Sequence, residues 1–358
     1  MKKIKVRKLL LFLLLFLLSF PAYGEKAGEM NIEEIIGHRE EDVVWVYDQE
    51  GSYIFGTALG VSIGDRYIDE ENIEYEIIEV KGDRAICRQK GKVDLLADID
   101  SDLALQIPLA AAGSKVVALY HTHNDESYIP GPVNIEGEGE IHEVGEALKK
   151  ALESKGITVL KSENLHLPHD GAAYERSRAT VAELIQKAPD VIFDIHRDAI
   201  PRKEEYQKEV DGKTISQIRL VVGRQNPNHK VNDQFARRLK AIADELYPGL
   251  IKGIFYGKGS YNQHVAPHSL LLEFGTHVTS KEQAIASAQL FAEPVSRLLY
   301  SSKNGEEGNK SEGRSISSTI SWILGITAIG VILFLFINEG SISGVGERLK
   351  KFFKRELK

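Results

Sequence analysis

Apolar runs of strand length alternate with segments of helical hydrophobic spacing through the middle of the chain. The runs fall at residues 116–120, 157–160, 191–195, 218–222 and 270–274, and the helical segments at 141–155, 172–187, 232–246 and 281–299. Runs of strand length that are mostly apolar are typical of strands that are buried on both faces. Strands and helices in alternation predict a mostly parallel sheet between two layers of helices. We therefore predict a three-layer α/β domain at residues 109–300.

Short runs in which apolar and polar residues alternate come before this domain. They occur at residues 43–47, 75–80 and 84–88, and segments rich in Gly and Asp separate them. Alternation over such short segments is typical of antiparallel strands. Residues 25–108 are therefore expected to form a small β module.

The N-terminus has the pattern of an export signal. Residues 1–8 are basic, residues 9–18 are apolar, and small residues stand at positions 22 and 24. This combination predicts a signal peptide at residues 1–24 that is cleaved after export. An uncleaved anchor is the less favoured alternative, because the apolar core is short for a helix that spans a membrane.

A second apolar segment lies near the C-terminus. We predict a flexible linker at residues 301–317, which are rich in Ser, Gly, Glu and Asn, and a transmembrane helix at 318–338. The basic tail at 339–358 is expected in the cytoplasm by the positive-inside rule, either as an amphipathic helix on the inner leaflet or solvated. The chain would then be a single-pass protein of the cell membrane, with its catalytic domain on the extracytoplasmic side.

Charge and cysteine content exclude two further possibilities. The net charge is −7, and no basic stripe occurs outside the two termini. Nucleic acid is therefore not an expected partner. Cys87 is the only cysteine in the sequence, so an intramolecular disulfide cannot hold the fold together.

Imidazoles and carboxylates follow several of the apolar runs, at the sheet edge where open α/β folds bind ligands. His123 and Glu126 stand three residues apart after the first run, and His196 ends the run at 191–195. Two His and one carboxylate are a common ligand set of catalytic zinc, so we predict a Zn²⁺ site at these three residues. If the segment is extended, His121 lies on the same face as His123 and could replace a ligand. Alternative carboxylate ligands are Glu138, Glu140 and Glu143.

Glu273 ends the run at 270–272 and is not needed as a ligand, so we expect it to be the general base. Asp194 and Asp198 could orient an imidazole. The candidate substrate-binding residues are Arg197, His169, Asp170 and Asp198. His264 and His268 flank a Gly/Ser-rich loop and could also contact substrate. Each signal is weak alone, because His and Glu at strand ends are commonly surface or capping residues, and the metal site rests on their joint placement.

At these residues the chain resembles the stage II sporulation protein P family. The resemblance rests on residues 120–128 (YHTHNDESY), 194–199 (DIHRDA) and 270–275 (LLLEFG), together with the His169-Asp170 pair and a helix that ends at Lys155-Gly156. It covers about residues 113–300. The resemblance implies a zinc-dependent N-acetylmuramoyl-L-alanine amidase, an exported and membrane-anchored peptidoglycan hydrolase of sporulation and engulfment. It also implies that His123 or His121, His196 and a carboxylate hold the ion, and that Glu273 is catalytic.

Two features depart from the family pattern, namely a C-terminal anchor in place of an N-terminal one and the β module before residue 108. From the resemblance, the chain is expected to cut the lactyl-L-alanine amide bond of peptidoglycan, and wall-degrading proteins are possible partners. A metallo-endopeptidase or carboxypeptidase that cuts stem peptides fits the same residues. A non-catalytic wall-binding module is the alternative from another class.

Overall fold

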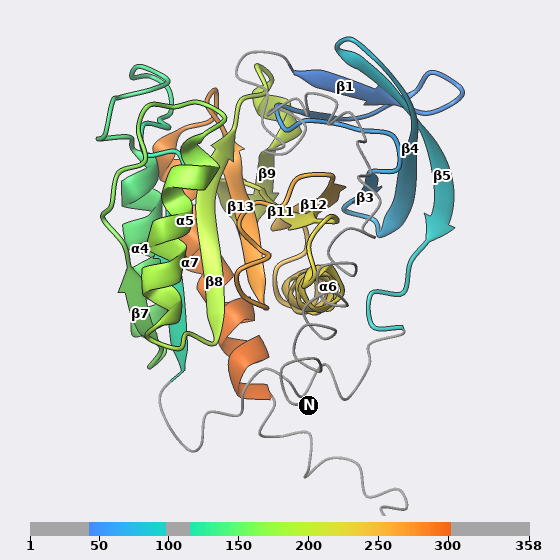
Figure 1. Cartoon of the computed structure of the whole chain (residues 1–358). Coiled ribbons are helices and arrows are strands. Elements are labelled where there is room, and N and C mark those ends of the chain that lie inside the picture. Colours follow the sequence, from blue (N-terminus) through green and yellow to red (C-terminus); the bar gives the residue numbers. More distant parts are fainter. Residues whose placement is uncertain (1–42, 98–114, 302–358) are drawn as a thin grey trace, which may run out of the picture. The chain divides into compact units, whose positions relative to one another are not determined.

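An eleven-stranded mixed sheet forms the centre of the computed structural model, which describes residues 43–97 and 115–301 (Figure 1). The strand order is β2-β1-β5-β4-β3-β12-β11-β13-β8-β6-β7. The strands are β1 (Val44–Tyr47), β2 (Tyr53–Thr57), β3 (Arg66–Ile68), β4 (Ile73–Lys81), β5 (Arg84–Lys92), β6 (Val116–Tyr120), β7 (Thr158–Lys161), β8 (Val191–Asp198), β11 (Ile218–Gly223), β12 (Ile251–Gly257) and β13 (Ser269–Thr276). A separate hairpin pairs β9 (Gln207–Val210) with β10 (Lys213–Ser216).

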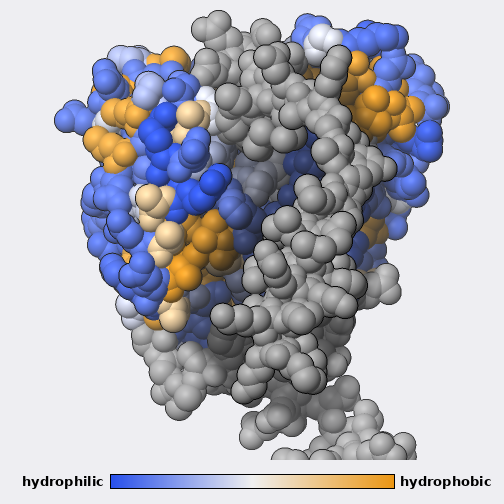
Figure 2. Space-filling model, in the orientation of Figure 1, coloured by the Kyte–Doolittle hydropathy of each residue, from blue (hydrophilic) through white to orange (hydrophobic). Residues whose placement is uncertain are grey.

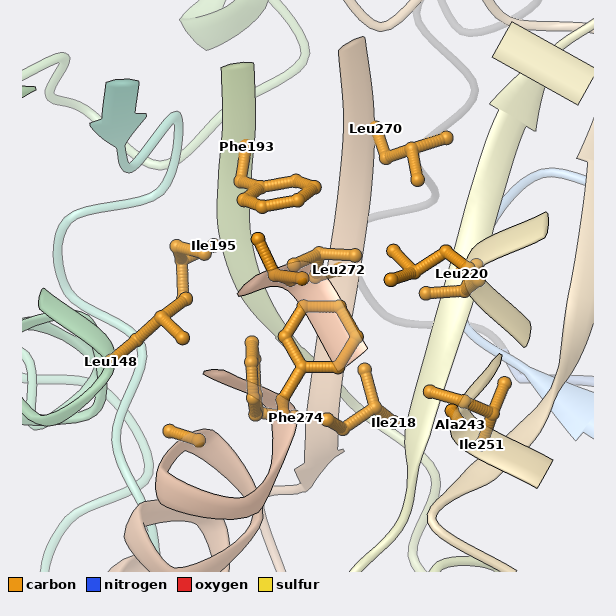
Figure 3. Close-up of a cluster of buried hydrophobic side chains, with 14 of the residues drawn as sticks. Leu148, Phe193, Ile195, Ile218, Leu220, Ala243, Ile251, Leu270, Leu272 and Phe274 are labelled. Carbon is orange, nitrogen blue, oxygen red and sulfur yellow. The ribbon is translucent and has the colours of Figure 1, made fainter. Parts of the chain in front are cut away.

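Helices cover both faces of the central strands, as the hydrophobic pattern predicted. They are α4 (Ile141–Glu153), α5 (Ala173–Ile185), α6 (His229–Leu246) and α7 (Lys281–Ser301). Side chains of α4, α6 and α7 share the large core under one face, part of which Figure 3 shows around Phe193, Leu272 and Phe274. Side chains of α5 pack with those of β6 and β8 on the other face. The expected three-layer α/β arrangement is therefore present.

Helix α4 illustrates how the sequence produces these elements. Its buried residues Ile141, Val144, Leu148 and Leu152 recur at intervals of three and four, which places them on one face of a helix. The helix ends before Gly156, whose φ of +78° is a left-handed conformation that favours glycine. This end directs the chain into β7.

The predicted parallel sheet holds with one exception. Strands β6, β7, β8 and β13 run parallel, whereas β13 is antiparallel to its other neighbour, β11. A parallel pair needs a crossover, and α6 supplies one between β11 and β12. Between β12 and β13 the chain forms only a loop, so β13 is antiparallel to β12 and to its neighbour in the sheet, β11. The sequence pattern showed each strand but not this reversal.

The N-terminal strands continue the same sheet. β3 pairs with β12, β4 pairs with β3 and β5, and β1 pairs with β2, all antiparallel, while β1 and β5 are parallel. The strands expected at 43–47, 75–80 and 84–88 are therefore present. They extend the central sheet through the β3–β12 ladder.

The predicted signal peptide, transmembrane helix and basic tail lie outside the described residues, and so does the predicted linker except for residue 301, which ends α7. Within residues 43–97 and 115–301, no helix has both the length and the apolar character needed to cross a membrane. On the face shown in Figure 2, the described surface is mainly hydrophilic. The large exposed hydrophobic residues of the described chain are Ile63, Leu96, Ile129, Val133 and Leu165.

Candidate metal centre

Three neighbouring strands position the candidate residues. β6 leads directly into the segment that carries His123 and Glu126, and its parallel neighbour β8 carries His196. Glu273 of β13 lies opposite His196 in the β8–β13 register. Side chains opposite each other in adjacent strands point to the same face, so the sheet brings these residues together from three parts of the sequence.

The structure gathers His123, Glu126 and His196 into one buried cluster, with one potential ligand atom of each within 4.8 Å of the others. Glu126 Oε1 lies 3.3 Å from His123 Nδ1 and 3.4 Å from His196 Nδ1. Zinc binds N and O ligands at about 2.0–2.2 Å, and two ligands of a tetrahedral ion are then about 3.4 Å apart. The donor set and the distances from Glu126 to the two histidines are therefore compatible with a tetrahedral divalent ion.

Electrostatics make Glu126 an anion and His123 a neutral imidazole, as ligands must be. Burial acts to raise the pKa of Glu126, but the His196 charge and hydrogen bonds from His123 and His196 hold it well below its usual value. Burial lowers the pKa of His123 to about 4 despite the hydrogen bond to Glu126. The second Glu126 oxygen accepts a hydrogen bond from the Arg197 backbone N–H at 2.9 Å, which fixes the carboxylate.

His196 contacts a carboxylate through each of its ring nitrogens. Nδ1 faces Glu126, and Nε2 lies 2.9 Å from Asp194 Oδ1. Burial acts to lower the pKa of His196, but the charges of Asp194 and Glu126 raise it well above its usual value. Asp194 thus has the orienting position that the sequence suggested.

Aromatic side chains enclose the cluster. The His169 ring stacks on His123 with centroids 4.0 Å apart, and its Nδ1 lies 2.7 Å from Asp125 Oδ1. Tyr174 of α5 packs against both histidines, edge-on to His123 at 5.6 Å and stacked on His196 at 6.2 Å. The His169 side chain is 23% exposed, whereas the His123 and His196 side chains are at most 1% exposed. His169 therefore lies between the cluster and solvent.

Glu273 is buried beside the cluster, and its Oε2 has no hydrogen-bond partner among the described residues. Burial, followed by the charge of Asp198, raises the pKa of Glu273 well above its usual value, although the His196 charge opposes the shift. A buried carboxyl with a raised pKa and a free oxygen can hold a proton as well as accept one, as a catalytic acid-base must.

The alternative ligands lie elsewhere. His121 is not extended alongside His123, because the chain bends after β6. Its ring packs against His142 of α4, and its Nδ1 lies 3.0 Å from the Ile195 carbonyl. Glu138 is exposed, and Glu140 pairs with Lys281 at 3.0 Å. The structure does not bring these alternatives to the cluster.

Of the candidate substrate-binding residues, some lie at the cluster and others make structural contacts. His169 is at the cluster, whereas Asp170 accepts a hydrogen bond from the Ala172 N–H at the start of α5 and pairs with Arg176. The Arg197 guanidinium donates to the carbonyls of Ser127 and Val133 and so holds the loop after Glu126.

Asp198 is buried and fully hydrogen-bonded. It accepts from the Arg219 guanidinium, the Tyr206 hydroxyl and the Ala58 backbone N–H. Sequence reasoning missed Arg219 because it lies within an apolar run, and Tyr174 because it belongs to a segment that was predicted only as a helix, at 172–187. Neither had a sequence signal, since the contact partners of both are distant in the chain.

Comparison with known proteins supports the resemblance. The family model described as "Stage II sporulation protein P (SpoIIP)" matches residues 69–296. The chain belongs to the stage II sporulation protein P family. The match begins at residue 69, between β3 and β4, so it includes part of the predicted β module as well as the central domain.

One curated member of the family, stage II sporulation protein P of Bacillus subtilis (strain 168), is 32% identical over 223 residues. The alignment covers 56% of this chain and 54% of that protein, so the chain spans about half the length of its relative. Among solved structures, an N-acetylmuramoyl-L-alanine amidase from Clostridium difficile 630 is 15% identical, with a TM-score of 0.35, over 54% of this chain and 98% of that one. An N-acetylmuramyl-L-alanine amidase from Mycobacterium smegmatis is 15% identical, with a TM-score of 0.34, over 52% and 97%.

Proposed function

We propose that the chain is a peptidoglycan hydrolase, a Zn²⁺-dependent N-acetylmuramoyl-L-alanine amidase that cuts the amide bond between the lactyl group and L-alanine. The observation that carries this proposal is the buried His123, Glu126 and His196 cluster, with Glu273 beside it. Family membership adds support, because the resemblance implies this reaction. The same resemblance suggests a role in sporulation, during engulfment, with other wall-degrading proteins as partners.

Each residue of the cluster has a role in this proposal. His123, Glu126 and His196 would hold the ion, since Glu126 Oε1 lies 3.3 Å and 3.4 Å from the two imidazoles, close to the spacing of two ligands of a tetrahedral ion. A divalent ion at this position supplies Lewis-acid chemistry, which polarises an amide carbonyl and makes water more acidic. Buried ligands that are already hydrogen-bonded in place lose little freedom when the ion binds.

Glu273 moves the proton. Its free Oε2 accepts a proton from the attacking water, and its raised pKa lets the carboxyl hold that proton until the amide nitrogen leaves with it. His169, which stacks on His123 and is partly exposed, is the substrate-binding candidate best placed to contact the scissile region. The contacts of Asp170, Arg197 and Asp198 favour structural roles for these three residues.

The experiment that tests the function is digestion of purified sacculi by the full chain, with and without a chelator, followed by mass analysis of the soluble products. An amidase releases whole stem peptides with a free L-alanine amine and leaves intact glycan strands. Chelation is expected to abolish release, and added Zn²⁺ to restore it. Full release by metal-free protein would contradict the proposal.

A metallo-endopeptidase or carboxypeptidase is the second candidate, because two His, one Glu and a separate Glu base also suit peptide hydrolysis. The same digest separates the two activities, since a peptidase shortens stem peptides or opens cross-links while the stems stay attached to glycan. A non-catalytic wall-binding module would release nothing. It is the less favoured function, because it gives no role to an unpartnered carboxylate oxygen beside the cluster.

A further inference from the structure

A chain of hydrogen-bonded polar side chains extends from His196 away from the metal cluster. Asp194 Oδ2 accepts a hydrogen bond from Thr122 Oγ1 at 2.6 Å, and Oδ1 accepts one from the Thr122 backbone N–H at 2.9 Å. Thr122 Oγ1 lies 3.0 Å from Ser177 Oγ, which accepts from Asn262 Nδ2 at 2.9 Å. Asp194, Thr122, Ser177 and Asn262 are all buried. We call these four residues the Asp194 relay.

The hydrogen bonds of the relay are compatible with donation toward Asp194. Asn262 Nδ2 donates to Ser177 Oγ, and the Ser177 proton can go to Thr122 Oγ1 at 3.0 Å or to the Tyr174 carbonyl at 3.3 Å. The Thr122 proton goes to Asp194. The carboxylate therefore receives two hydrogen bonds from Thr122 alone. The carboxylate also accepts a hydrogen bond from the Tyr120 hydroxyl. His196 Nε2 lies 2.9 Å from Asp194 Oδ1, and a carboxylate that accepts hydrogen bonds from its other neighbours is an acceptor toward this ring nitrogen as well.

We propose that Asp194 is a positioning residue of the metal site. With an ion in the cluster, Asp194 would hold the proton of His196 on Nε2, so that the Nδ1 lone pair is left for the ion. The proposal rests on the proposed metal-dependent function and specifies how this chain presents one of its ligands. A carboxylate behind a histidine ligand fixes the tautomer and ring orientation and makes the imidazole a stronger donor.

The relay also connects the ligand to two distant parts of the fold. Ser177 belongs to α5, and Asn262 belongs to the loop between β12 and β13. Asn262 Nδ2 also donates to the Tyr174 carbonyl at 2.8 Å, and the Tyr174 ring packs on both histidines. The α5 helix and this loop thus hold Asp194 and the aromatic side of the cluster through the same contacts.

The test measures metal binding by the full chain in detergent, using Zn²⁺ competition with a chromophoric chelator and the visible absorption of the Co²⁺-loaded protein. Asp194→Asn places a donor where Thr122 needs an acceptor, and we expect it to weaken Zn²⁺ binding about 10- to 100-fold. Thr122→Val keeps the shape and removes one hydrogen bond to Asp194, so a smaller loss is expected. Both variants should also alter the Co²⁺ spectrum.

Asp190→Asn is the matched control. Asp190 is another buried carboxylate, just before β8, but it accepts from the Val116 N–H and pairs with Lys115. Wild-type affinity and Co²⁺ spectrum are expected for this variant. If Asp194→Asn does not fold, Thr122→Val decides the matter by the same two readouts.

The outcomes separate this inference from the proposed function. The inference alone would be overturned if a folded Asp194→Asn variant had wild-type Zn²⁺ affinity and a wild-type Co²⁺ spectrum. If Asp194→Asn does not fold, the same result in Thr122→Val would overturn it. If every variant binds metal as expected but the wild-type chain does not hydrolyse sacculi, the amidase proposal is overturned and the inference stands. A wild-type chain that binds neither metal would overturn both.

Discussion

At the scale of single residues, similar side chains a few positions apart have different roles. His121 and His123 both follow β6, yet His121 packs against α4 while His123 joins Glu126 and His196. Burial lowers the pKa of both imidazoles, so charge does not distinguish them. The distinction comes from the bend after β6, which ends the strand alternation on which the expectation of a shared face depended.

The role of Glu273 is tested by Glu273→Gln. Gln keeps the size of the side chain but cannot accept the proton, so turnover on sacculi should fall at least about 100-fold while Zn²⁺ content stays near wild type. His196→Ala should instead lose the metal. Turnover and metal content of both purified variants are the measurements.

Glu140→Gln is the control for the carboxylates near the first helix. Glu140 is bound to Lys281 and to the Tyr128 backbone, so we expect wild-type metal content and turnover. Near-normal turnover in Glu273→Gln, or loss of metal in that variant, would show that another carboxylate is the base. Loss of metal in Glu140→Gln would make this residue a ligand.

Sequence reasoning identified the cluster residues because each follows an apolar run, where a polar side chain stands out. It could not separate ligands from structural residues among their neighbours. Asp198 and Arg197 stand in the same motif as His196, yet Asp198 pairs with Arg219 and Arg197 holds the loop after Glu126. These partners are 21 or more residues away, and residue spacing along the chain carries no information about such contacts.

At the scale of elements, hydrophobic periodicity predicted the helices and the central strands, since burial imposes a period on each of them. It did not predict that β13 is antiparallel to β11. Strand direction depends on the connection before it, and the loop between β12 and β13 contains no helix to return the chain. This reversal places Glu273 between His196 and Arg219 in the register of three strands.

The packing of α4 on the sheet provides a stability prediction. Leu148 is fully buried and lies near Ile195 in the core (Figure 3). Leu148→Ala should reduce the free energy of unfolding by about 2–5 kcal/mol, because it removes buried apolar surface and leaves a cavity. Leu96→Ala, at a 59% exposed position, should change the free energy of unfolding by less than about 0.5 kcal/mol. Denaturant unfolding of both variants checks this, and equal losses would contradict the core assignment.

The start of β13 should make the fold sensitive to acid. His268 precedes the strand, is buried against Phe235, and has its pKa lowered to about 4 by burial, with a smaller contribution from Arg238. The pKa of His268 is lower in the folded state than in the unfolded chain. The stability that depends on its neutral imidazole is therefore fully present above pH ~6.5 and is lost as the pH falls toward 4. A shift of this size corresponds to at most about 3 kcal/mol.

His268→Asn removes this titration. Asn tolerates the positive φ of 53° at this position better than most residues do. The free energy of unfolding of the variant should therefore decline less steeply than that of the wild type between pH 6.5 and 4, even if it is lower at neutral pH. Parallel curves for the two proteins in this range would contradict the assignment to His268.

At the scale of the whole molecule, the sheet links the N-terminal strands to the candidate site. Arg219 is fully buried and donates to Asp198 of β8 and to the Gly56 carbonyl of β2. Asp198 is two residues from His196, so one buried cation connects the strands at the start of the described chain with the strand that carries a proposed metal ligand. The predicted β module is therefore linked to the candidate metal cluster through the sheet and this arginine.

The sequence outside the described residues predicts attachment to a membrane with a defined orientation. The apolar segment at 318–338 is followed by a tail with six Lys or Arg residues, which are Arg348, Lys350, Lys351, Lys354, Arg355 and Lys358. Basic residues beside a spanning segment are retained on the cytoplasmic side, so the catalytic domain should face outward.

Protease added outside intact spheroplasts should therefore release a fragment that contains Glu273 and leave an epitope placed after Lys358 protected. Permeabilising the membrane should expose the epitope, which provides the control for protease access. An epitope that is cleaved in intact spheroplasts would refute this orientation. Protection of the Glu273 fragment in intact spheroplasts would refute it as well. Such protection would also contradict the proposed function, because a peptidoglycan hydrolase must meet its substrate outside the membrane.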